Sequence, residues 1–258
     1  MSAVLSAVEA SSVNSEAVER ELRIQLAAAY RLVEHFGWSE LIYGHLTARI
    51  PGETPTFLIN PYGFNYEEIT ASSLVRIDVD GNVVGESNHP VNRAGFVIHS
   101  AVHMANSVNK CVMHTHTRAG MAAAALEDGL LQVHMYSTGF HGRIAYHEYE
   151  GPSLDLDERE RLLADLGGSK AMILRNHGIL TVGRTIPEAF IWLYRLERAC
   201  QVQLDAMAAG RLHVIDPKVV EHSARQTTRF LESEAAAGEL EFQALMRKLD
   251  RIDPSYRD

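Results

Sequence analysis

The spacing of apolar residues predicts helices and strands that alternate along most of the chain. From Glu16 apolar positions recur at helical intervals, which indicates a first amphipathic helix. Residues 41–50 and 56–60 have the composition of strands. The alternation through residues 74–79 runs up to Asp80-Gly81, a pair typical of a tight hairpin turn.

Beyond residue 90 the predicted helices and strands continue in the same mixed order. Thr185 and Glu188 have the spacing of a capping box, and they predict a helix that Gly210 ends. The elements before it are a helix over 92–106, a buried strand over 111–116, a small-residue helix over 118–128, and two short strands within 170–183 broken at Asn176-His177-Gly178.

Composition and organisation favour one globular α/β domain. The chain has 258 residues, of which 46% are apolar and 22% are charged, enough for one substantial core. Residues 1–15 are small and polar, and we expect them to be flexible. A single domain is predicted over 16–258, with C-terminal helices from about residue 216.

Charge and cysteine content narrow the expected partners and compartment. The net charge is −9 and no basic stripe is present, so neither nucleic acid nor an anionic membrane is an expected partner. Cys111 and Cys200 are unclustered, which favours a reducing compartment. Without a signal-peptide pattern or a membrane-spanning apolar run, the sequence predicts a cytoplasmic protein.

Thirteen histidines offer the clearest candidate chemistry. His114 and His116 are two apart in a predicted strand, so their imidazoles project from one face and could bind a metal. Two partly buried histidines bonded to backbone or water would show the same pattern. His177 precedes a glycine after an apolar strand, which suits a third ligand but equally suits a plain hairpin turn. For His99, on the predicted 92–106 helix, we expect a role that supports the metal ligands or a packing role.

Several segments together resemble the class II aldolase/adducin family. They are "YGHLTARIP", "LINPYGFNYEEITASSLVRIDVDGNVV", "VNRAGFVIHSAVHMANSVNKCVMHTHTRAG" and "AMILRNHGILTVG", in family order. The resemblance implies a three-layer α/β/α fold with a central, largely antiparallel sheet. It also implies a homotetramer with sites at subunit interfaces. One divalent metal, usually Zn²⁺ with Fe²⁺ or Mn²⁺ as alternatives, would be bound by His114, His116 and His177, with His99 behind them.

The sequence departs from the sugar-phosphate aldolases of this family at the proton-transfer and phosphate positions. Gly95 stands where their catalytic glutamate is expected, and Arg93 and Ala94 replace two serines. Arg93 presents a fork suited to a carboxylate, although a surface residue at a helix start would look the same. The predicted substrate-binding residues are Arg93, Asn92, His45, Tyr62 and Gly63.

These departures favour a metal-dependent lyase that acts on a small non-phosphorylated hydroxy- or oxo-carboxylate, by decarboxylation or aldol-type cleavage. Tyr136 or His134 is the expected proton donor, since the family supplies a tyrosine near this point from a neighbouring subunit; His141 is a weaker candidate. One alternative is a non-haem Fe(II) oxygenase that shortens an aryl-pyruvate side chain. Another is an adducin-like assembly module without activity, because most animal adducin heads are regarded as structural.

Overall fold

The computed structural model describes residues 2–87, 89–105, 108–151, 157–232 and 237–258, with the side chains of 2–14, 93–97 and 232 left aside. A seven-stranded sheet forms its middle layer, in the order β3-β2-β1-β4-β7-β6-β5. Every neighbouring pair is antiparallel except β5 and β6, which are parallel. The strands are β1 (His45–Ile50), β2 (Thr56–Ile59), β3 (Val75–Ile77), β4 (Cys111–Thr115), β5 (Ile144–His147), β6 (Ala171–Leu174) and β7 (Gly178–Gly183).

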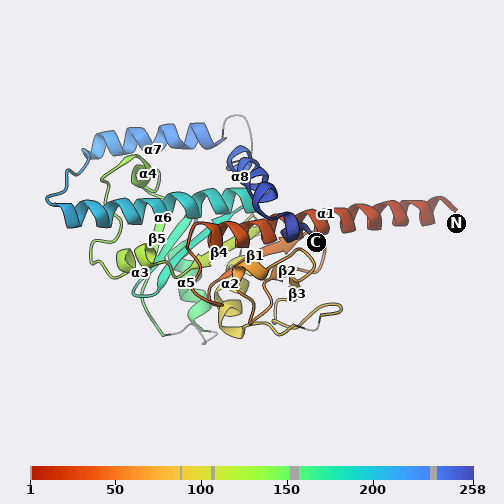
Figure 1. Ribbon diagram of the computed structural model, residues 1–258. Coiled ribbons are helices and arrows are strands. Elements are labelled where there is room, and N and C mark those ends of the chain that lie inside the picture. The colour runs from red at the N-terminus through yellow and green to blue at the C-terminus, as the bar shows by residue number, and fades with distance from the viewer. Residues whose placement is uncertain (1, 88, 106–107, 152–156, 233–236) are drawn as a thin grey trace.

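Helices cover both faces of this sheet, so the predicted three-layer α/β/α fold is confirmed (Figure 1). One face carries α1 (Ser2–His35), α3 (Arg118–Ala124), α6 (Ile186–Ala209) and α8 (Glu239–Ile252). The other face carries α2 (Arg93–Ala105) and α5 (Glu158–Leu166). Further out are α4 (Met135–Thr138), α7 (Pro217–Glu232), and the short 3-10 helices η1 (Tyr66–Glu68) and η2 (Pro254–Arg257).

Side-chain alternation along the central strands explains why both layers form. In β4, Met113 packs toward α1 and α6, while its neighbour Val112 packs with Leu180 and Val182 against α2 and α5. Every residue of β4 is buried. A strand enclosed on both faces reads as a continuous apolar run, which is how residues 111–113 appear in the sequence.

The first helix and the first strand begin at other residues than predicted. The first helix begins at Ser2 rather than at Glu16; the flexibility expected of residues 1–15 stays a prediction. The strand predicted over 41–50 begins only at His45. The preceding residues form a turn, with Leu41 at φ 52° and Gly44 at φ 81°, which lie outside the β region.

The start of α6 is also a variation on the predicted capping box. The Thr185 hydroxyl accepts the Glu188 N–H at 3.2 Å, as expected. The Glu188 carboxylate instead accepts the Arg184 N–H, at 2.7 Å, and forms an ion pair with Lys170 at 3.1 Å. Within the described residues, no helix is long and apolar enough to cross a membrane.

Candidate metal centre

The end of β4 and the turn between β6 and β7 bring three imidazoles together. His114 Nε2 lies 2.8 Å from His116 Nε2, which lies 3.0 Å from His177 Nε2. One ligand atom from each of the three histidines lies within 4.8 Å of the others. Strand β4 therefore aligns His114 and His116, and the β6–β7 turn places His177 beside them.

Backbone contacts fix the orientation of these rings. His114 Nδ1 lies 3.0 Å from the carbonyl oxygen of Ile179; since a carbonyl only accepts, Nδ1 carries the hydrogen and Nε2 presents a lone pair. Gly178 permits this approach, because a Cβ there would lie 2.6 Å from the Thr115 carbonyl and 3.2 Å from the His116 ring. The glycine after His177 is thus required by close packing at the site.

The surroundings keep all three imidazoles neutral. Burial lowers the pKa of His114 well below its usual value, and the neighbouring imidazoles lower it further. Burial and His116 lower the pKa of His177 to about 4. Burial also lowers the pKa of His116, against which the Glu40 carboxylate acts in the opposite direction. Neutral imidazole is the form that binds a metal.

The spacing of the nitrogens fits a single divalent ion. Ligand nitrogens 2.0–2.1 Å from one ion lie about 3.0 Å apart at the right angles of octahedral coordination, and about 3.4 Å apart at tetrahedral angles. The separations of 2.8 and 3.0 Å match the octahedral value. Three lone pairs directed at one point repel one another unless a proton or a cation lies between them, and a three-histidine set suits Zn²⁺, Mn²⁺ or Fe²⁺.

Two further predicted residues lie next to the triad on the face covered by α2. His45 is directly opposite His114 in the β1–β4 ladder, and its Nδ1 lies 3.3 Å from Asn60 Oδ1. His99 is buried, with Nδ1 2.8 Å from the Thr47 hydroxyl, which also lies 2.8 Å from His103 Nε2. His99 contributes to the lowered pKa of His114, and the supporting role expected of it stays a prediction.

The predicted substrate-binding residues lie in segments near the end of the sheet that carries His45. The turn that carries Tyr62 and Gly63 directly follows Asn60, the neighbour of His45. The Tyr62 N–H donates to the Pro90 carbonyl at 2.8 Å, which joins this turn to the segment leading into α2. Asn92 lies in that segment, and Arg93 is the first residue of α2, with a side chain outside the described part.

The three predicted proton donors lie elsewhere in the chain. Tyr136 belongs to α4, where its ring packs on the core and 5.9 Å from the Arg195 guanidinium of α6. His134 is the N-cap of α4, with Nδ1 accepting the Tyr136 N–H at 3.2 Å. His141 is exposed in the turn that follows. A role at the metal centre therefore requires another subunit, as the resemblance implies, and stays a prediction.

Two residues that the sequence did not single out border the triad. The Tyr149 ring meets the His177 ring edge-on, with centroids 6.4 Å apart, and 55% of Tyr149 is exposed. Glu40 pairs with Tyr43 in a turn that precedes β1. Because His45 is opposite His114, this turn extends past the end of β4 toward His116. No local pattern marks either residue, since both contacts join segments far apart in the sequence.

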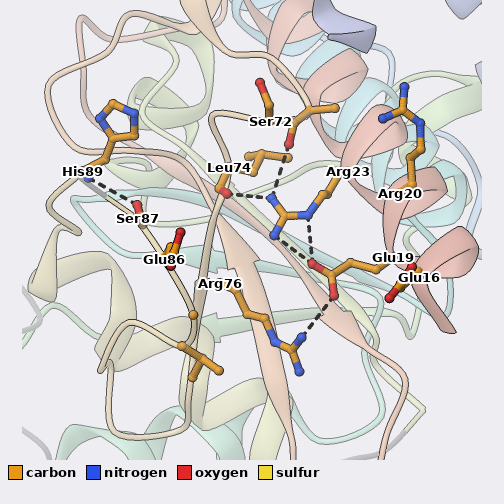
Figure 2. Close-up of a pocket in the computed structure, with 13 residues that line it drawn as sticks. Glu16, Glu19, Arg20, Arg23, Ser72, Leu74, Arg76, Glu86, Ser87 and His89 are labelled. Carbon is orange, nitrogen blue, oxygen red and sulfur yellow. Dashed lines mark hydrogen bonds and ion pairs between the residues drawn. The ribbon is translucent and has the colours of Figure 1, made fainter. Parts of the chain in front are cut away.

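A separate open cavity of about 910 Å³ contains none of the predicted site residues. It lies between α1 and the segments around residues 71–76 and 84–89 (Figure 2). Arg23 and Arg76 both form ion pairs with Glu19, at 2.8 and 3.1 Å, and Arg23 also donates to the Leu74 carbonyl. These contacts tie α1 to β3 at the edge of the sheet.

Known proteins share the sequence pattern and the fold of this chain. Residues 24–204 match the Class II Aldolase and Adducin N-terminal domain. The chain belongs to the class II aldolase and adducin family. Among solved structures, it is similar to an aldolase II superfamily protein from Pseudomonas syringae, with 45% identity, a TM-score of 0.88, and coverage of 93% of this chain and 96% of that one.

Two other members of this family show how widely its proteins differ. The chain is 33% identical to the L-fuculose 1-phosphate aldolase from Glaciozyma antarctica PI12, with a TM-score of 0.82 and coverage of 95% and 94%. It is also 41% identical to α-adducin from Rattus norvegicus over 247 residues, which make up 91% of this chain and 34% of that protein. Family membership therefore indicates the fold of the metal-dependent class II lyases. The substrate depends on the residues around the triad.

Proposed function

We propose that this member of the family is a metal-dependent carbon–carbon lyase for a small non-phosphorylated hydroxy- or oxo-carboxylate. The observation that supports this most is the convergence of three neutral imidazoles, His114, His116 and His177, whose Nε2 atoms lie 2.8 and 3.0 Å apart. A zinc ion bound there, or Fe²⁺ or Mn²⁺, would supply a Lewis acid for an enolate developing on the substrate.

The protein's own residues would bind and orient that substrate. Arg93 would hold a substrate carboxylate through two parallel hydrogen bonds. His45, fixed by Asn60 beside His114, would line the same edge with Tyr62, Gly63 and Asn92. Burial lowers the pKa of His45 to about 4 in spite of its hydrogen bond with Asn60, so it would remain neutral and offer a hydrogen bond instead of a charge.

Proton return requires a donor, and Tyr136 of a neighbouring subunit is the proposed one, with His134 and His141 as alternatives. This part of the proposal needs a homotetramer. Light scattering is expected to give about four times the chain mass of 28.7 kDa. A monomer at micromolar concentration would exclude a donor from another subunit.

Aldol cleavage of a sugar phosphate is the second candidate function. It is favoured by 33% identity to a protein described as L-fuculose 1-phosphate aldolase. It is disfavoured by Gly95, where the resemblance implies a catalytic glutamate, and by Arg93 and Ala94 in place of two serines. Loss of general acid–base assistance alone reduces rates by roughly 10²–10⁴-fold.

A two-armed assay separates these candidates. The zinc-, manganese- or iron-loaded protein is tested on fuculose and rhamnulose 1-phosphates, and on a panel of hydroxy- and oxo-acids with release of carbon dioxide or aldehyde as the readout. We expect turnover of a carboxylate, with Arg93→Ala weakening kcat/KM by at least tenfold and exposed Arg211→Ala leaving it unchanged. Efficient cleavage of the sugar phosphates would overturn the carboxylate proposal; oxygen-dependent turnover would indicate an oxygenase.

A further inference from the structure

Outside the triad, another buried histidine, His147, lies among carboxylates at the end of β5. His147 is only 3% exposed, and its Nδ1 lies 2.7 Å from Asp165 Oδ2 on α5. A hydrogen on Nδ1 makes this contact in the neutral ring, because an ionised carboxylate oxygen accepts. The remaining nitrogen, Nε2, then presents its lone pair to the other side of the ring.

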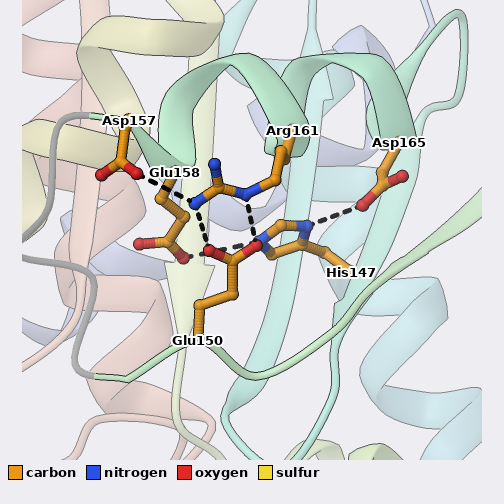
Figure 3. Close-up of polar contacts among 6 residues, drawn as sticks. All are labelled: His147, Glu150, Asp157, Glu158, Arg161 and Asp165. Atoms are coloured by element: carbon orange, nitrogen blue, oxygen red, sulfur yellow. Dashed lines mark hydrogen bonds and ion pairs between the residues drawn. The ribbon is translucent and has the colours of Figure 1, made fainter.

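That nitrogen is buried without a hydrogen-bond partner. It faces Glu158 Oε1 at 3.5 Å and Glu150 Oε1 at 3.9 Å (Figure 3). A buried lone pair beside two carboxylates is unfavourable unless a proton or a cation lies between them. The cluster therefore calls for one of the two.

The distances distinguish a proton from a cation. A shared proton draws a charged N···O pair to about 2.8 Å, as occurs on the Asp165 side of the same ring. Ligand atoms 2.0–2.2 Å from one tetrahedral ion lie about 3.4 Å apart. The Glu158 separation of 3.5 Å matches the second value, and that of Glu150, 3.9 Å, exceeds it by an amount that a side-chain adjustment can close.

The local charge also favours a cation. Three carboxylates, those of Glu150, Glu158 and Asp165, face the ring, while Arg161 contacts Glu150 and Asp157 lies beyond Arg161 (Figure 3). Arg161 contacts both oxygens of Glu150 and lies 3.5 Å from Asp157.

We propose that His147 Nε2, Glu158 and Glu150 form a second divalent-cation site, distinct from the histidine triad. The donor set of one imidazole and two carboxylates suits Zn²⁺ or Mn²⁺. Asp165 orients the imidazole from behind, an arrangement common among metal-bound histidines. The site is independent of the proposed lyase reaction.

This second site is joined to the loop that carries His177. The Arg175 N–H donates to the His147 carbonyl at 2.8 Å, and Tyr149, two residues beyond His147, meets the His177 ring. His147, Tyr149, Glu150, Glu158 and His177 line one small hollow. Occupancy of the site would therefore hold the end of β5 against the triad and steady the His177 loop.

Metal stoichiometry tests the proposal. Chelator-stripped full-length protein is titrated with zinc and with manganese by calorimetry, and the retained metal is measured by mass spectrometry after desalting. We expect two equivalents per chain in the wild type and one in either Glu158→Gln or His177→Ala. Glu160→Gln, on the exposed side of the same helix, is the matched control and should keep two.

Two outcomes would overturn the second site. One is a single equivalent in the wild type that His177→Ala removes and Glu158→Gln keeps. The other is an imidazolium signal from His147 at pH 8 in nitrogen-15 spectra, unchanged by added metal, because a proton would then occupy the gap. Should Glu158→Gln fail to fold by circular dichroism, Asp165→Asn replaces it, with two equivalents expected but the second bound 10–100-fold more weakly.

Discussion

The two histidine clusters beside the β6–β7 turn differ in what surrounds the imidazole. In the triad, His114, His116 and His177 face one another, and burial keeps them neutral. Around His147 the neighbours are carboxylates. An ion held by three neutral ligands would keep its charge available to polarise a substrate, whereas two carboxylates would neutralise it. The first arrangement suits chemistry, and the second suits a structural role.

Among the predicted changes, removal of one triad imidazole should have the largest effect on metal affinity. His177→Ala is expected to lower metal affinity at the triad by more than about 100-fold, since loss of a supporting hydrogen bond alone costs 10–100-fold. Competition with a chromogenic chelator measures the change. His222→Ala, on the exposed side of α7, is the control. Unchanged affinity in His177→Ala would exclude the triad as the metal centre.

Acid should affect the neutral histidines behind the triad before it affects the carboxylates. Burial lowers the pKa of His103 to about 3, so below pH 6.5 the unfolded chain takes up a proton that the folded chain does not. Stability is therefore complete above pH 6.5 and declines as pH falls toward 3. Between pH 7 and 5 this one group should cost about 2 kcal/mol.

Urea unfolding of metal-free protein at pH 7 and pH 5 tests this expectation. His103→Gln should have a shallower loss of stability over this range than the wild type, whatever its stability at pH 7. Equal pH slopes in the two proteins would mean that His103 has the same pKa in the folded and the unfolded chain.

Tyr149 connects the two clusters, and its replacement should have a smaller effect. Tyr149→Ala removes the ring that meets His177, so we expect a several-fold weaker metal affinity at the triad. Tyr149→Phe retains the ring contact and should behave as the wild type in metal binding. A loss of turnover in Tyr149→Phe at normal metal affinity would instead identify its hydroxyl group as part of the reaction.

Relief of backbone strain beside the triad is the smallest expected effect. Leu41 at φ 52° and Asn176 at φ 55° are the non-glycine residues with positive φ in the described ranges. Leucine loses roughly 1 kcal/mol in this region, and Leu41 is 69% exposed, so Leu41→Gly sacrifices little packing. We expect it to raise the free energy of unfolding by up to about 1 kcal/mol. Asn176→Gly should change it little, because asparagine tolerates this conformation.

Local sequence patterns predicted several elements because they report short-range physics, but they did not predict β5, α4 or α5. The 171–183 hairpin, the capped α6 and the buried β4 all follow from apolar period and turn chemistry. Boundaries set by tertiary contacts were less accurate. The strand expected from residue 41 begins at His45, since the Glu40–Tyr43 turn folds back on itself.

Long-range contacts account for what the sequence left open at the site. His114 and His116 were paired by the two-residue period of a strand, but spacing alone left His177 between a ligand and a turn residue. The β4–β7 ladder settles its position, because Thr115 pairs with Ile179, two residues beyond His177. Tyr136 could be placed on α4 but not at the triad within one chain.

The sequence by itself determined the mixed order of helices and strands, the strand-borne histidine pair and the motifs whose family resemblance implied the layered fold. Only the tertiary structure placed Tyr149 and Glu40 beside the triad and surrounded His147 with Glu150, Glu158 and Asp165. The physical reason is the distance along the sequence over which each kind of interaction acts. Periodicity encodes which face a side chain takes, whereas its partners come from segments that are distant in sequence and adjacent only after the sheet and its helices have packed.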